Sequence, residues 1–106
     1  KKMSKYINTD IALNNQLSRT AHALVLPLML LANDNNEIAK SAFIKMVGWI
    51  TDSRTWNKYW KELTNKGVLV RLGRDKWMVS PHECYADGAS HNTLINKWNE
   101  ARNAIN

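Results

Sequence analysis

The apolar positions of this chain recur at helical spacing in several stretches and alternate in others. The stretch 19–32 is the most apolar, and Pro27 within it removes one backbone donor and predicts a kink. Ser18 stands where the N-cap of such a helix would lie. A helix without a polar face is buried on several sides, so we expect this one inside the core or against a second copy.

Two further helices are predicted after a turn rich in Asn and Asp. Residues 37–40 are expected to form a short strand, and Ser41 to cap a helix that runs to about Ile50. Asp52 is the predicted N-cap of the next helix, at 53–65, because its carboxylate can accept a hydrogen bond from an unpaired amide of the first turn. Gly67 is expected to end that helix in the left-handed conformation.

The remaining third of the chain predicts a hairpin and a final helix. Two extended runs, 68–72 and 76–80, flank a short turn, and Pro81 closes the second run. A polar loop at 82–91 follows. Apolar residues then return at helical spacing up to the C-terminus: Leu94, Ile95, Trp98, Ala101 and Ile105.

The predicted order is helix, strand, helix, tight turn, helix, hairpin and final helix, which is the order of a winged helix-turn-helix domain. We therefore predict a mainly α fold with a small β-hairpin, of the α+β class. Residues 1–17 are polar and would form an N-terminal arm, and 18–81 the winged domain. Residues 82–106 would supply a loop and an extra C-terminal helix that packs on the core or forms a dimer contact.

The helix at 53–65 has the most informative pattern. At about 100° per residue, Trp56, Trp60 and Leu63 fall within one narrow sector. The opposite arc carries only cations and amides: Arg54, Asn57, Lys58, Lys61 and Asn65. Such a face suits the major groove of DNA, where Arg and Lys reach guanine acceptors or phosphate oxygens and Asn pairs with adenine.

The distribution of charge strengthens this interpretation. The chain has a net charge of +6 and a pI near 9.7. The window 53–76 holds seven cations against two acids, a net +5. A cationic helix face taken alone is usually a solvated one. Here the helix break before it and the basic hairpin after it favour a nucleic-acid partner.

We predict that double-stranded DNA is the partner. The predicted base-reading residues lie in the first half of the third helix: Ser53, Arg54, Asn57 and Lys58. The predicted phosphate or minor-groove contacts come from the same helix and from the hairpin: Lys61, Arg71, Arg74 and Lys76.

Other patterns favour less specific roles. The five tryptophans could stack on unpaired bases, but Trp56 and Trp60 share the apolar stripe and Trp77 lies in a strand, which favours core packing. His82, Cys84 and His91 match no ordinary zinc spacing, so we expect a polar loop and no metal or other cofactor.

No catalytic constellation is present in the pattern. The glycines are too far apart for a phosphate-binding loop, no carboxylates are paired at helical spacing, and no small-molecule substrate is evident. The chain is therefore not expected to be an enzyme. A single cysteine fits a reducing cytoplasm. The apolar run 23–32 is shorter than the roughly 20 residues that cross a membrane.

The stretch 17–88 resembles the winged-helix replication proteins of the RepL type, which occur on plasmids of Gram-positive bacteria. The resemblance rests on Ser-Arg-Thr-Trp at 53–56, Lys-Glu-Leu-Thr-Asn-Lys-Gly-Val at 61–68, and Lys-Trp-Met-Val-Ser-Pro at 76–81, with Leu17-Ser18 before them and Gly88 after them. The family more often has Asn-Pro where this chain has Ser80-Pro81. The resemblance implies origin binding in plasmid or phage replication. The recognition-helix positions would then be held by Arg54, Asn57, Lys58 and Lys61.

Three functional hypotheses follow. The first is a replication initiator, the second a winged-helix transcriptional regulator, and the third, from another class, a protein-interaction adaptor that binds no DNA. The apolar surplus of the first and last helices also suggests a homodimer, for which two half-sites about 10–10.5 bp apart are expected.

Overall fold

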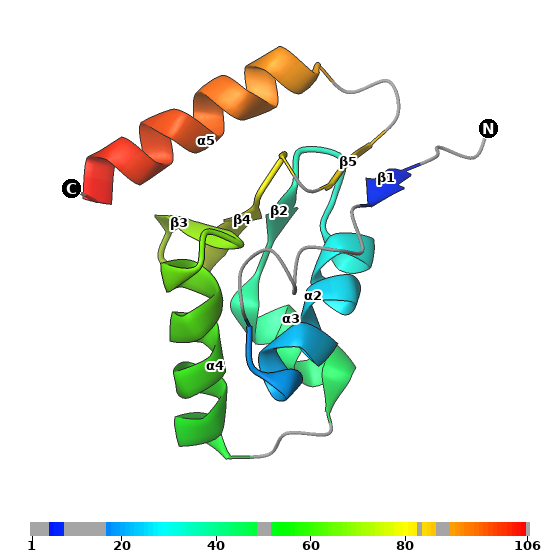
Figure 1. The fold of residues 1–106 in the computed structure, drawn as a ribbon, viewed down its shortest axis with the longest axis vertical. Coiled ribbons are helices and arrows are strands. Elements are labelled where there is room, and N and C mark those ends of the chain that lie inside the picture. The colour runs from blue at the N-terminus through cyan, green and yellow to red at the C-terminus, as the bar shows by residue number, and fades with distance from the viewer. Residues whose placement is uncertain (1–4, 8–16, 49–51, 83, 87–89, 106) are drawn as a thin grey trace.

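The structure is a computed structural model and describes residues 5–7, 17–48, 52–82, 84–86 and 90–105. Figure 1 shows its helices arranged around a small sheet. The elements in chain order are β1 (Lys5–Ile7), α2 (Arg19–Leu31), β2 (Glu37–Ile38), α3 (Lys40–Val47), α4 (Ser53–Asn65), β3 (Leu69–Gly73), β4 (Lys76–Val79), β5 (Cys84–Ala86) and α5 (His91–Ile105). The described chain is thus an α+β domain, as expected.

The main sheet has three antiparallel strands in the order β2-β4-β3. Arg71 on β3 faces Trp77 on β4, and Val70 faces Met78. Because successive side chains of a strand point to opposite faces, Trp77 and Met78 lie on different sides of the sheet. The predicted hairpin is confirmed, with its turn at 74–75.

One face of the sheet is covered by α2, α3 and α4 around a shared apolar core. Phe43 of α3 lies at its centre, with its ring centroid 5.9 Å from the rings of Trp56 and Trp60. Trp60 meets Trp77 edge-on, with centroids 5.5 Å apart, an arrangement that aromatic quadrupoles favour. Core packing of these tryptophans is therefore confirmed.

The opposite face of the sheet is covered by α5. Leu94 and Trp98 of that helix pack against Val70 and Met78 in a second apolar cluster. Figure 1 shows α5 lying across this end of the molecule, separated from α4 by the strands. The sheet is therefore buried on both faces.

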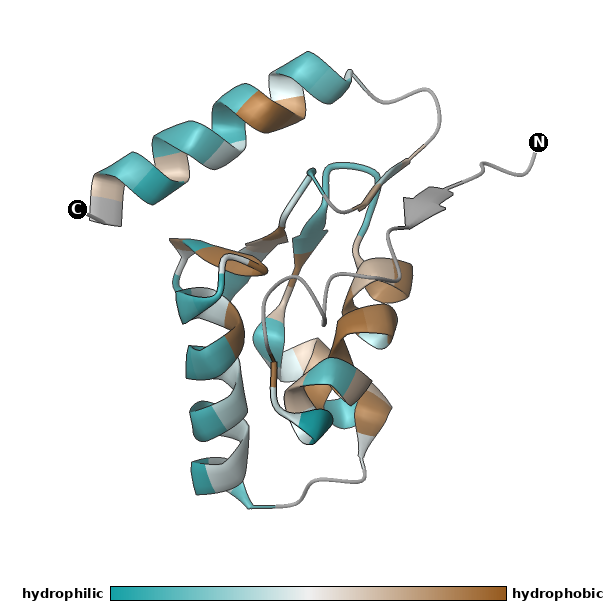
Figure 2. Cartoon of the chain, in the orientation of Figure 1, coloured by the Kyte–Doolittle hydropathy of each residue, from teal (hydrophilic) through white to brown (hydrophobic). Residues whose placement is uncertain are grey.

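Helix α2 begins as predicted and stays apolar on its outer side. The Ser18 hydroxyl accepts a hydrogen bond from the Ala21 amide (3.3 Å), and the helix passes through Pro27 to Leu31. Leu26 and Leu30 remain 46% and 57% exposed. Figure 2 shows the brown, hydrophobic colouring concentrated on α2 rather than on α4. No described helix combines the length and the apolar character needed to cross a membrane.

Helix α3 differs from the prediction at both ends. It begins at Lys40, and its N-cap Ala39 makes no side-chain cap, so the predicted cap by Ser41 is wrong. The backbone amides of Lys40 and Ser41, in the first turn, donate instead to the carboxylate of Asp75 from the hairpin turn. The helix ends at Val47, where Gly48 takes the left-handed conformation (φ 71°), so the predicted end at Ile50 is also wrong. Residues 49–51 lie outside the described part. The strand expected at 37–40 is limited to Glu37–Ile38.

A second, two-stranded sheet joins segments for which no strand was predicted. β1 lies in the expected arm and β5 in the expected polar loop, and they pair antiparallel with Tyr6 opposite Tyr85. The buried Asn36, in the left-handed region (φ 60°), anchors β5 to the rest of the domain. Its Nδ2 donates to the carbonyls of Val79 (3.1 Å) and Cys84 (2.7 Å).

Candidate nucleic-acid interface

Helix α4 has the bounds that its capping residues predict. The Asp52 carboxylate accepts from the Thr55 amide (3.2 Å) and the Thr55 hydroxyl (3.0 Å). At the other end Gly67 is left-handed (φ 82°), and the Val68 amide closes on the Leu63 carbonyl (2.9 Å). Asp52 as the N-cap and Gly67 as the terminator are both confirmed.

The outward face of α4 is polar and exposed. Trp56, Trp60 and Leu63 are buried. The exposed residues on the other side include the predicted base-reading and phosphate-contacting positions: Ser53, Arg54, Asn57, Lys58 and Lys61. Figure 2 shows α4 hydrophilic or neutral over nearly its whole length. Among the described residues, neither Arg54 nor Lys61 forms an ion pair.

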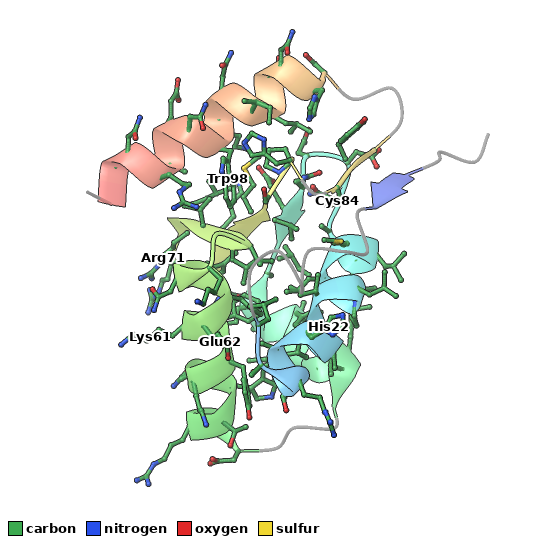
Figure 3. All side chains as sticks on the ribbon, in the orientation of Figure 1. His22, Lys61, Glu62, Arg71, Cys84 and Trp98 are labelled. Carbon is green, nitrogen blue, oxygen red and sulfur yellow. The ribbon has the colours of Figure 1, made fainter. Side chains whose placement is uncertain are left out.

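The single acid within α4 is directed away from this face. Both carboxylate oxygens of Glu62 accept hydrogen bonds from Ser18, one from its amide (2.7 Å) and one from its hydroxyl (2.9 Å). Figure 3 shows Glu62 turned toward α2 and Lys61 pointing out on the other side of α4. The carboxylate therefore fastens α4 to the start of α2 and leaves the cations of the outward face unopposed.

Lys40, on α3, also lies at the outward face of α4, although the sequence did not indicate it as a site residue. Its Nζ donates to Asn57 Oδ1 (2.9 Å) and lies 5.6 Å from the ring centroid of Trp60. No local sequence signal indicates this contact, because the two residues are 17 positions apart and belong to different helices.

The hairpin brings Arg71 to the same side of the molecule as α4. Its guanidinium lies 6.0 Å from the Trp77 ring, and Nε donates to the Gly73 carbonyl (2.9 Å). Figure 3 shows Arg71 and Lys61 projecting to the same side, away from the core. Arg74, in the turn, is exposed. The hairpin thus adds positive charge beside α4.

Lys76 is the one predicted site residue that the structure does not bring to α4. Its Nζ lies 3.7 Å from Glu37 Oε1, on the sheet face that α5 covers. Lys97 of α5 donates to the other oxygen of Glu37. The hydrogen bond from Lys97, assisted by the charges of both lysines, holds the pKa of Glu37 below its usual value.

Asp75 holds the hairpin turn against α3. Its carboxylate accepts from the Ser41 hydroxyl and from the Ser41 amide (3.1 Å), and these hydrogen bonds lower the pKa of Asp75. The negative charge at the start of α3 also complements the helix dipole. The carboxylate of Asp75 is therefore hydrogen-bonded within the protein and does not oppose the cations of the outward face.

The histidines and cysteine considered for a metal site lie in ordinary surroundings. Cys84 is buried beside Asn36, and His91 Nε2 lies 2.9 Å from the Pro81 carbonyl, with its ring against Tyr85. The described residues contain no group of three metal-ligating side chains. Glu83 and Asp87, the two carboxylates of this loop that could supply a fourth ligand, lie outside the described residues.

No family model matches the chain, and no curated protein or solved structure is significantly similar to it. The RepL-type resemblance stays an expectation from the sequence.

Proposed function

We propose that this protein binds double-stranded DNA, with α4 in the major groove and the β3–β4 hairpin alongside. The observation that carries the proposal is the exposed, acid-free face of α4 next to the cations of the hairpin. DNA presents a dense row of phosphates, so a protein surface with unopposed cations gains affinity by releasing counterions.

The arrangement of elements supports the same proposal. α3 and α4 are consecutive helices, β2 lies between α2 and α3, and β2 pairs with the second strand of the hairpin. We assign this arrangement to a winged helix-turn-helix fold with an added C-terminal helix. In helix-turn-helix proteins the second helix of the pair enters the major groove with its N-terminal residues at the base edges.

The side chains then have separate roles. Ser53, Arg54, Asn57 and Lys58, near the start of α4, face the bases. The phosphate contacts come from Lys61, Arg71 and Arg74. Lys76 is left out of the interface, because its exposed side chain lies toward Glu37, on the face of the sheet that α5 covers.

Fluorescence anisotropy with a labelled duplex of random sequence tests the proposal across a salt series. On a duplex of random sequence Arg54 and Lys58 meet no matching base and contact phosphates together with Lys61, Arg71 and Arg74. Log affinity should then fall against log salt with a slope of about −4 to −5. The double variant Arg54→Ala/Lys58→Ala should weaken binding by at least about tenfold and reduce the slope by about 2.

The matched control removes two cations that lie on α5 and not on the outward face of α4. Lys97→Gln/Arg102→Gln, on α5, should leave affinity and slope nearly unchanged. Absence of binding at low salt would overturn the proposal in favour of the adaptor hypothesis. Preference for single strands, with tryptophan quenching, would replace duplex binding by stacking on unpaired bases.

For the biological role, the RepL-type resemblance supports a replication initiator of a plasmid or phage, and a transcriptional regulator is the alternative. A footprint over the DNA surrounding the protein's own gene separates the two roles. Protection of tandem repeats at an origin supports initiation, whereas protection over a promoter supports regulation.

A further inference from the structure

The hydrogen bond between Lys40 and Asn57 fixes which end of the Asn57 amide faces outward. An ammonium group only donates hydrogen bonds, so the atom that meets Lys40 Nζ has to be the amide oxygen. The NH₂ group of Asn57, on the exposed face of α4, is then the end left for an incoming partner.

Lys40 is itself held by two independent contacts. Its ammonium lies against the face of the buried Trp60, which favours a fixed position for the charge. Its backbone amide is hydrogen-bonded to Asp75 of the hairpin turn. Lys40 is half-buried, its ammonium lies over the Trp60 ring, and its backbone amide is bound to Asp75. Together these contacts restrict the directions from which Nζ can reach Asn57.

The result is a pair of neighbouring groups that both present donors. Asn ordinarily reads adenine with two hydrogen bonds, accepting from N6 and donating to N7. Here one lone pair of the accepting oxygen is engaged by Lys40, and the adjacent ammonium opposes a second donor, such as the adenine N6 amino group, at the other. Guanine offers two acceptors, O6 and N7, at the same edge.

We propose that Lys40 is a positioning residue that converts Asn57 from an adenine reader into a guanine reader. This inference rests on the proposed binding of duplex DNA by α4. Lys40 acts through Asn57, and its loss changes which base is preferred rather than how many phosphates are contacted.

Selection from duplexes with a randomised core tests the inference. The wild-type protein should enrich guanine at one position, and Asn57→Ala should lose the preference at that position alone. Lys40→Met keeps the stem against Trp60 but removes the donor. It should shift the ratio of guanine to adenine there by about tenfold toward adenine, the discrimination typical of one bidentate contact.

Two further variants make the result specific. Lys45→Met removes another exposed lysine from α3 and should leave the preference unchanged. Asn57→Asp presents only acceptors, so it should select cytosine, whose N4 amino group donates. This second variant tests whether residue 57 reads that base even if Lys40→Met does not fold.

The outcomes separate this inference from the proposed function. If the wild-type protein enriches no sequence and binds no duplex, the proposed function fails. If it enriches guanine and Lys40→Met does so equally, DNA binding stands and the positioning role is wrong. A drop of about 0.9 in the salt slope of Lys40→Met with an unchanged base preference would also overturn the inference, since it indicates a phosphate contact.

Discussion

Helices α4 and α5 pack against opposite faces of one sheet and look alike by composition. Each has a buried apolar stripe with tryptophan, and each exposes asparagine and at least one cation. On α5, however, Lys97 is paired with Glu37, and Arg102 lies 5.6 Å from the Trp98 ring and against Gly67. On α4 the only acid is turned to Ser18.

The difference shows that exposure and cation content do not by themselves define a binding face. Lys58 of α4 and Arg102 of α5 each lie over a ring of their own helix, so what separates the two helices is the ion pair that joins α5 to the sheet. The cations of α5 stabilise its attachment to the sheet, whereas Arg54 and Lys61 of α4 have no ion pair among the described residues. Five experiments test this contrast.

The largest expected effect comes from the two tryptophans that anchor these helices. Trp60→Ala should lower the free energy of unfolding by about 4–5 kcal/mol, because Trp60 contacts both Phe43 and Trp77 in the main core. Trp98→Ala should cost about 3 kcal/mol, the lower end for such a change, because its cluster is smaller. Urea denaturation followed by circular dichroism measures both.

The same two variants test whether the faces are independent. At a temperature where Trp98→Ala remains folded, its DNA affinity should match that of the wild-type protein. An equal loss of DNA binding in both variants would show that α5 contributes to the interface.

Glu37→Gln should have a smaller effect, confined to the α5 side. It removes the carboxylate that faces both Lys97 and Lys76, which should lower the free energy of unfolding by about 1 kcal/mol. DNA affinity should not change, because Lys76 lies on the α5 face. An increase in DNA affinity would mean that the released Lys76 reaches DNA, contrary to its placement here.

Acid should weaken the same attachment. Since the pKa of Glu37 is lowered in the folded protein, its contribution is present above the ordinary value of 4.5 and is lost as the pH falls through the folded-state pKa. Thermal unfolding between about pH 6 and pH 3 should therefore show a steeper loss of stability in the wild-type protein than in Glu37→Gln. Parallel curves would contradict this role for Glu37.

The smallest effect should come from adding one charge to each helix. Asn65→Lys, at the end of α4, should steepen the salt slope by up to about 0.9 and strengthen binding a few-fold. Asn103→Lys, at a matching exposed position near the end of α5, should change neither. Equal gains from both substitutions would indicate that overall charge, and not the α4 face, attracts DNA.

The parts of the fold that sequence predicted well are those with local causes. Asp52 and Gly67 define both ends of α4 because a cap and a left-handed glycine act on neighbouring backbone groups. The hairpin is equally local. The spacing of Trp56, Trp60 and Leu63 was sufficient to predict which side of α4 is buried.

The parts that sequence did not predict depend on contacts between distant segments. β1 and β5 are three-residue strands that exist by pairing with each other across most of the chain. The first-turn amides of α3 are capped by Asp75, which lies 34 positions after Ser41 in the chain. Because local sequence patterns do not reach that far, they indicated Ser41 as the cap. For the same reason the sequence wrongly placed Lys76 beside α4 and gave no indication that Lys40 lies there. The partner of each, Glu37 or Asn57, is set by the tertiary fold.

The β3–β4 hairpin is packed on both faces, and Asp75 fixes its turn to α3. A hairpin that is fixed along its strands and at its turn cannot readily change shape to fit DNA grooves of different width. The DNA would have to supply the adjustment by bending or by narrowing. Since flexible pyrimidine–purine steps deform at a lower energetic cost than stiff A-tracts, base pairs that no side chain touches would still influence affinity.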